Sequence, residues 1–94
     1  METAHLLIIG KVQGVFFRET SRKVAEELNI KGWIKNNPNG DVEALITGKE
    51  KEVDDFVNWC RVGPERAEVD EVKISKQQVQ HFEKFEVIKK NKVY

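Results

Sequence analysis

The sequence lacks the features that mark secreted, membrane-spanning and nucleic-acid-binding chains. Its single cysteine cannot form an internal disulfide, and no run of about 18 apolar residues could span a bilayer. No apolar leader with a cleavage site is present. The 16 basic and 16 acidic side chains cancel, so no overall field attracts nucleic acid or an anionic membrane. We therefore expect a cytoplasmic protein with no nucleic-acid and no membrane partner.

Residues for metal binding or nucleophilic catalysis are also scarce. The two histidines, His5 and His81, have no cysteine or carboxylate at ligand spacing, so we predict no metal site and no cofactor. Cys60 falls on an apolar helical stripe, where a thiol more often packs as a small hydrophobe than acts as a nucleophile. Any chemistry must therefore rest on other groups.

The first half of the chain predicts a strand, a helix and a hairpin. The short apolar run HLLIIGKV, residues 5–12, is typical of a strand buried on both faces. Apolar residues then recur at helical spacing from Phe17 to Leu28, and Asn29 suits a left-handed helix end. Extended GWIKN, the turn NPNG and extended DVEALITG follow, which together predict a hairpin.

The second half predicts one more helix and two more extended segments. The helix runs from about Lys49 to Val62, and Gly63-Pro64 ends it. Its inward stripe is formed by four residues at helical spacing: Val53, Phe56, Val57 and Cys60. AEVDEVKIS and FEKFEVIK then alternate as strands do, around a polar QQVQH link.

This order, with one short extra strand, predicts an α+β fold. It is a ferredoxin-like βαββαβ sandwich, with an antiparallel sheet and two helices on one face. We expect a single domain over residues 1–94 that acts as a monomer. In this topology the first and second strands run parallel, with the third between them, so their C-terminal ends lie ~10 Å apart at one edge of the sheet.

The stretch GKVQGVFFRET, residues 10–20, lies at that edge. Its turn leads into a helix, so its backbone N–H groups include unpaired first-turn donors that, with the helix dipole, favour an anion. Gly14 lets the backbone curl and approach a ligand without a Cβ in the way. By itself the pattern fits an ordinary strand-to-helix connection equally well.

Two further residues help to distinguish an anion site from an ordinary strand-to-helix connection. Arg18 falls in the first helical turn, where a cation opposes the helix dipole by ~0.3–1 kcal/mol unless an anion lies beside it. A solvated ion pair with Glu19 is the alternative role for Arg18. Asn36 ends the second strand at the same edge of the sheet, although asparagine is also common beside turns for local reasons.

Taken together, four motifs resemble the acylphosphatase family in order and spacing. They are GKVQGVFFR, GWIKN, NGDVE and GPERAEVDEV, and the resemblance extends from about Leu6 to Lys89. The turn after GWIKN is often Asp-Gly in this family and here is Asn39-Gly40, which can adopt the same backbone. The usual aromatic-x-Ile-Arg-Tyr end of the last strand is also altered, with Tyr94 several residues late, which puts in doubt any bracing of the phosphate loop by the terminus.

The resemblance implies an enzyme, an acylphosphate phosphohydrolase of the acid-anhydride hydrolase class. It implies that Arg18 binds the phosphoryl group of an acyl phosphate and that Asn36 orients the attacking water. The cradle for the phosphate oxygens, and for the product inorganic phosphate, would be backbone amides of five residues: Gly14, Val15, Phe16, Phe17 and Arg18. No metal or cofactor takes part in the family's reaction.

Two other functions remain open from the sequence. A non-catalytic anion-binding regulatory module would keep the loop and lack turnover. An RNA-binding domain of the same fold is disfavoured by the neutral charge and by the aliphatic residues where stacking aromatics would lie on the central strands.

Overall fold

The computed structural model of the chain describes residues 1–89, and in this part five strands and two helices follow one another in the predicted order. They are β1 (Glu2–Lys11), α1 (Phe17–Glu27), β2 (Lys31–Asn36), β3 (Val42–Gly48), α2 (Glu50–Val62), β4 (Glu68–Gln77) and β5 (Phe85–Ile88). The predicted left-handed residue at the end of α1 is confirmed, because Asn29 has φ 59°.

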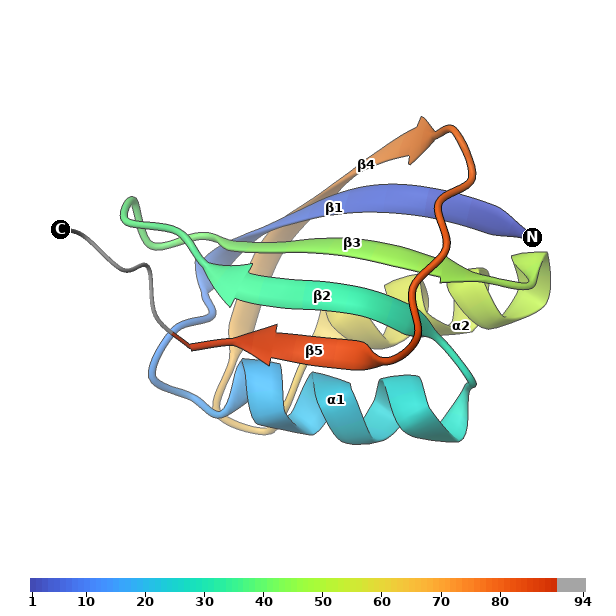
Figure 1. Ribbon diagram of the computed structural model, residues 1–94. Coiled ribbons are helices and arrows are strands. Elements are labelled where there is room, and N and C mark those ends of the chain that lie inside the picture. The colour runs from blue at the N-terminus through green and yellow to red at the C-terminus, as the bar shows by residue number, and fades with distance from the viewer. Residues whose placement is uncertain (90–94) are drawn as a thin grey trace, which may run out of the picture.

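The sheet has the predicted ferredoxin-like topology, with strand order β4-β1-β3-β2-β5. β3 pairs antiparallel with both β1 and β2, so β1 and β2 run parallel to one another and end at the same edge of the sheet, as predicted. Both helices lie on one face (Figure 1). The short β5 pairs in parallel with β2, which makes the sheet mixed rather than wholly antiparallel.

A linker, residues 78–84, carries the chain from β4 across the sheet to the opposite edge, where β5 lies (Figure 1). Its backbone is fixed at Gln80, whose N–H donates to Thr3 Oγ1 at 2.8 Å and whose carbonyl accepts from Thr47 Oγ1 at 2.9 Å. The linker thus covers two threonines that would otherwise face water, and both are buried. These bonds help to fix the position of β5.

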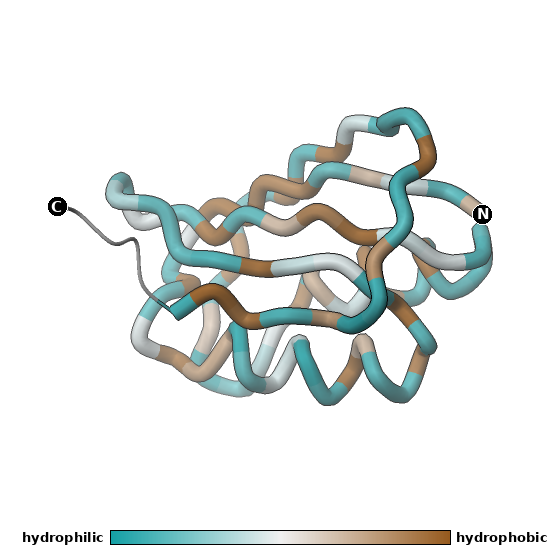
Figure 2. Tube along the Cα trace, in the orientation of Figure 1, coloured by the Kyte–Doolittle hydropathy of each residue, from teal (hydrophilic) through white to brown (hydrophobic). Residues whose placement is uncertain are grey.

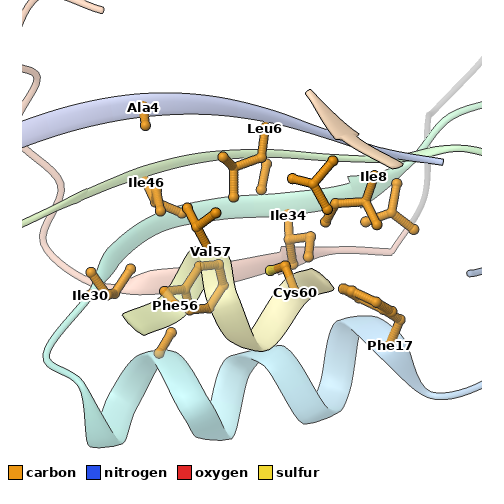
Figure 3. Close-up of a cluster of buried hydrophobic side chains, with 14 of the residues drawn as sticks. Ala4, Leu6, Ile8, Phe17, Ile30, Ile34, Ile46, Phe56, Val57 and Cys60 are labelled. Carbon is orange, nitrogen blue, oxygen red and sulfur yellow. The ribbon is translucent and has the colours of Figure 1, made fainter. Parts of the chain in front are cut away.

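The core lies between the sheet and the helices, and Figure 2 shows hydrophobic segments along both the strands and the helices. The predicted inward stripe of α2 is confirmed, and Phe56 and Cys60 are fully buried against side chains of β1, β2 and β3 (Figure 3). Burial raises the pKa of the Cys60 thiol, so this side chain is an inert packing group rather than a nucleophile. Neither helix within residues 1–89 is long and apolar enough to cross a bilayer.

The prediction that β1 is buried on both faces is wrong. Leu6 and Ile8 are fully buried, but Leu7 and Ile9 between them are only half-buried. The reason is that the helices cover one face of the sheet, so successive side chains alternate between the core and the open face. A short apolar run does not distinguish these two cases.

The first turn of α1 is anchored to α2 by aromatic packing. Phe17 is buried, and its ring lies 5.3 Å from that of Trp59, centroid to centroid, at an interplanar angle of 59°. Ser21, one turn later, is also buried and donates a hydrogen bond of 2.6 Å to the Arg18 carbonyl. This packing sets where the helix begins, and therefore where the preceding loop must turn.

Candidate active site

The loop between β1 and α1, residues 12–16, has an unusual backbone. Gly14 has φ 74° and Phe16 has φ 62°, both in the left-handed region. A Cβ built on Gly14 would meet nothing within 4 Å, so glycine is needed here for its backbone angle rather than for space. Left-handed residues in such a turn direct neighbouring N–H groups to one side, which makes a concavity that binds anions.

The N–H groups of this loop are free to bind a ligand. Within residues 1–89, the amides from Gly14 to Arg18 donate no hydrogen bond to another backbone group or to a side chain. Phe16 is the N-cap of α1 and supplies no side-chain cap. The first-turn donors of the helix therefore remain available, with the positive end of the helix dipole behind them.

Arg18 is held by the last strand. Its Nη1 donates to the Ile88 carbonyl at 3.0 Å, which leaves the other guanidinium donors available for a ligand. The alternative pairing with Glu19 is not formed, because Glu19 binds Lys89 at 3.0 Å and Arg22 at 3.3 Å instead. These two cations lower the pKa of Glu19, so its carboxylate is ionised and neutralised by its partners at neutral pH.

Asn36 is the last residue of β2. Side chains alternate along the strand, so Asn36 shares with the fully buried Ile34 the face that the helices cover. Its Oδ1 atom is buried, and within residues 1–89 it has no hydrogen-bond partner. A buried amide oxygen without a partner costs stability, and it can accept a hydrogen bond from a ligand that enters the pocket.

One pocket of about 310 Å³ brings these groups together. Five of its lining residues carry the argument: Gly14, Phe16, Phe17, Arg18 and Asn36. The predicted site residues therefore meet at the shared edge of the sheet, with one exception. Val15 is buried and does not line this pocket, so its side chain belongs to the core and only its amide could face a ligand.

Two groups at the site were not assigned a role from the sequence. The Gln13 side chain donates through Nε2 to the carbonyls of Asn37 at 2.7 Å and Asp41 at 2.9 Å, which ties the loop to the β2–β3 turn. The sequence offered one signal for Gln13, a polar amide between valines that prove to be buried. It offered no signal for the Ile88 carbonyl, because every residue has a backbone acceptor. The last strand does contact Arg18 through this carbonyl, whereas Tyr94, on which the question of bracing by the terminus depends, lies outside the described residues.

The link made by Gln13 is testable. We expect Gln13→Met, which keeps the length of the side chain but removes both donors, to lower the free energy of unfolding by about 1–2 kcal/mol. We also expect it to weaken competitive inhibition by inorganic phosphate several-fold, because the loop loses its tie to the β2–β3 turn. Urea unfolding and phosphate inhibition measure the two effects. Gln77→Met, on an exposed glutamine of β4, is the control, and equal effects of both variants would contradict the role of Gln13.

Comparison with known proteins bears out the resemblance read from the VQGV and GWIKN motifs. The acylphosphatase family model matches residues 4–87. The acylphosphatase of Thiobacillus denitrificans is 47% identical over 75 residues, which are 80% of this chain and 84% of the relative. Among solved structures, the acylphosphatase of Coxiella burnetii is 40% identical, with a TM-score of 0.89, and covers 93% of this chain and 92% of its own. The acylphosphatase of Bacillus subtilis is 27% identical, with a TM-score of 0.91, and the match covers 94% of this chain and 99% of that structure's chain. The chain therefore belongs to the acylphosphatase family and has acylphosphatase activity.

Proposed function

We propose that this enzyme hydrolyses the carboxyl-phosphate bond by direct in-line attack of one water molecule on the phosphorus. The observation that carries this proposal is the buried Oδ1 of Asn36, which has no hydrogen-bond partner in the described part of the chain and belongs to the pocket that Arg18 and the loop also line. An amide oxygen there accepts a hydrogen bond from water and fixes the direction of the water lone pair. Asn36 and Arg18 are then the catalytic residues.

The phosphoryl group is held by the amides from Gly14 to Arg18 and by the Arg18 guanidinium. These donors are fixed before substrate binds, the amides by the helix start and the guanidinium by its bond to Ile88. Negative charge on the three equatorial oxygens must be stabilised as the reaction proceeds, and preorganised donors do this without rearrangement. The bound anion also reverses the unfavourable position of Arg18 at the positive end of α1.

The bond changes need no protein acid or base. The water oxygen forms a bond to phosphorus while the bond from phosphorus to the acyl oxygen breaks, and the acyl oxygen keeps the electron pair. The leaving group is a carboxylate whose conjugate acid has a pKa near ~4, so it departs unprotonated at neutral pH. The proton of the water passes to a phosphoryl oxygen, and the products are a carboxylate and inorganic phosphate.

Hydrolysis of benzoyl phosphate in the presence of EDTA tests this mechanism. We expect turnover with EDTA to stay within about twofold of the untreated rate, because charge on the phosphoryl oxygens is balanced by Arg18 and amides rather than by a cation. The release of benzoate is followed by ultraviolet absorbance, and a parallel sample with excess Mg²⁺ is the control. Loss of turnover in EDTA that Mg²⁺ restores would contradict the mechanism.

A further inference from the structure

Phe16 occupies a position that folding stability does not explain. Its side chain is 71% exposed, so the ring contributes little to the core. Its backbone has φ 62°, a left-handed conformation that is rare for a bulky residue and that glycine or asparagine adopts with less strain. A phenylalanine here therefore strains the backbone and adds little to the core, so neither effect accounts for the ring at this position.

Phe16 lies where two hollows meet. It lines the pocket that contains Arg18 and Asn36, and it also lines a neighbouring hollow of about 430 Å³. The hollow lies between α1 and the segment that follows α2, and Pro64 lines its other side. Asn36 is among the lining residues of the first pocket and not of the second.

The direction of attack determines which of these surfaces meets the acyl group. In an in-line displacement the leaving oxygen lies opposite the attacking water. The water is held by Asn36 at the end of β2, whereas Phe16 is the N-cap of α1 and belongs to the loop that cradles the phosphate. The acyl group therefore extends away from Asn36, and of the two hollows that Phe16 lines, only the second lacks Asn36.

The charges around that hollow indicate which acyl groups it suits. Its ionisable lining residues are two acids and two bases: Glu19, Glu65, Lys23 and Arg66. Because Glu19 also pairs with Lys89 and Arg22, these four residues leave about one net positive charge, which attracts a charged acyl group only weakly. The exposed aromatic ring, in contrast, favours a flat or bulky apolar group that packs against it.

We infer that Phe16 forms the binding surface for the acyl group, and that the enzyme prefers acyl phosphates with aromatic or other bulky apolar acyl groups. This inference rests on the proposed function, from which it takes the direction of attack. Phe16 is in this view a specificity-determining residue, and its side chain acts on the substrate separately from its backbone amide.

Two substrates and a matched pair of variants test the inference. The substrates are benzoyl phosphate and acetyl phosphate, which share the phosphoryl group and differ in the acyl group. Phe16→Asn removes the ring but retains a residue that tolerates positive φ, so the loop backbone is preserved. Val62→Asn removes an equally exposed apolar side chain, 72% exposed, at the end of α2. We expect Phe16→Asn to lower the ratio of kcat/KM for benzoyl phosphate to that for acetyl phosphate about tenfold, and Val62→Asn to leave the ratio unchanged.

Binding of the methylene-bridged phosphonate analogues of the two substrates, measured by calorimetry, gives the same comparison without turnover. We expect Phe16→Asn to reduce the preference for the benzoyl analogue by a similar factor. An unchanged preference in both measurements would overturn the inference. A changed binding preference in an enzyme whose turnover proved independent of Asn36 would overturn the proposed mechanism instead and would leave the role of Phe16 supported.

Discussion

Asn36→Ala is expected to lower kcat about 10²–10³-fold while competitive inhibition by inorganic phosphate stays near the wild-type value. The water loses the acceptor that fixes its direction, but the phosphate cradle of loop amides and Arg18 is untouched. The variant should be at least as stable as the wild type, because the substitution removes a buried amide oxygen that has no partner within residues 1–89. Steady-state kinetics with benzoyl phosphate and thermal unfolding measure these effects.

Asn37→Ala is the matched control for that variant. Asn37 follows directly in the chain but does not line the pocket. Its hydrogen bonds to Asp41 and Gln13 use backbone atoms that alanine retains, and its side chain interacts with the Glu43 carboxylate, away from the pocket lining. We expect its kcat to remain within about twofold of wild type. Full activity of Asn36→Ala, or an equal loss in both variants, would show that Asn36 does not orient the water.

Arg18→Ala is expected to act on binding and on catalysis together. Loss of its charged hydrogen bonds should weaken phosphate inhibition about 10–100-fold, since a hydrogen bond to a charged group contributes about 1.5–3 kcal/mol. The value of kcat/KM should fall about 10³-fold, because the guanidinium also stabilises charge that grows in the transition state. This combined effect distinguishes Arg18 from Asn36, whose removal should affect turnover alone.

Arg18→Lys separates the charge of the side chain from its shape. Lysine keeps the positive charge but cannot at once donate to the Ile88 carbonyl and bind phosphate with a planar fork. We expect it to recover phosphate inhibition in part and kcat only slightly. Arg22→Ala, one turn further along α1 and paired with Glu19 and Glu26, is the control and should have little effect. Recovery of full activity by Arg18→Lys would mean that charge alone suffices.

The features that the sequence predicts well are those carried by local patterns. The apolar spacing of α2 identified Val53, Phe56, Val57 and Cys60 as its buried face, and all four are buried. The NPNG turn identified the hairpin, and the order of elements then placed the ends of β1 and β2 at one edge. Candidate site residues came together because topology, rather than any single motif, determines which strand ends meet.

The features that the sequence does not reveal depend on backbone atoms brought together from distant segments. The contact between Arg18 and Ile88 uses a carbonyl group, which carries no residue signature. The register of the strands is a second case. Asn36 and Ile8 both pair with Val42 of β3, so β1 continues beyond the level at which β2 ends. The left-handed angle of Phe16 is a third, because its side chain favours other conformations and the turn around it imposes this one.

The bond between Arg18 and β5 has a consequence for when the enzyme becomes active during synthesis. Its two residues are 70 positions apart, and β5 is only four residues long. A growing chain that has completed α1, β3 and even β4 already carries the phosphate loop, yet its arginine has no brace. Closing so long a segment of chain comes late, because its entropy cost is met only when the intervening strands have paired. The brace on Arg18 therefore requires β5, the last strand within residues 1–89, to be in place in the sheet.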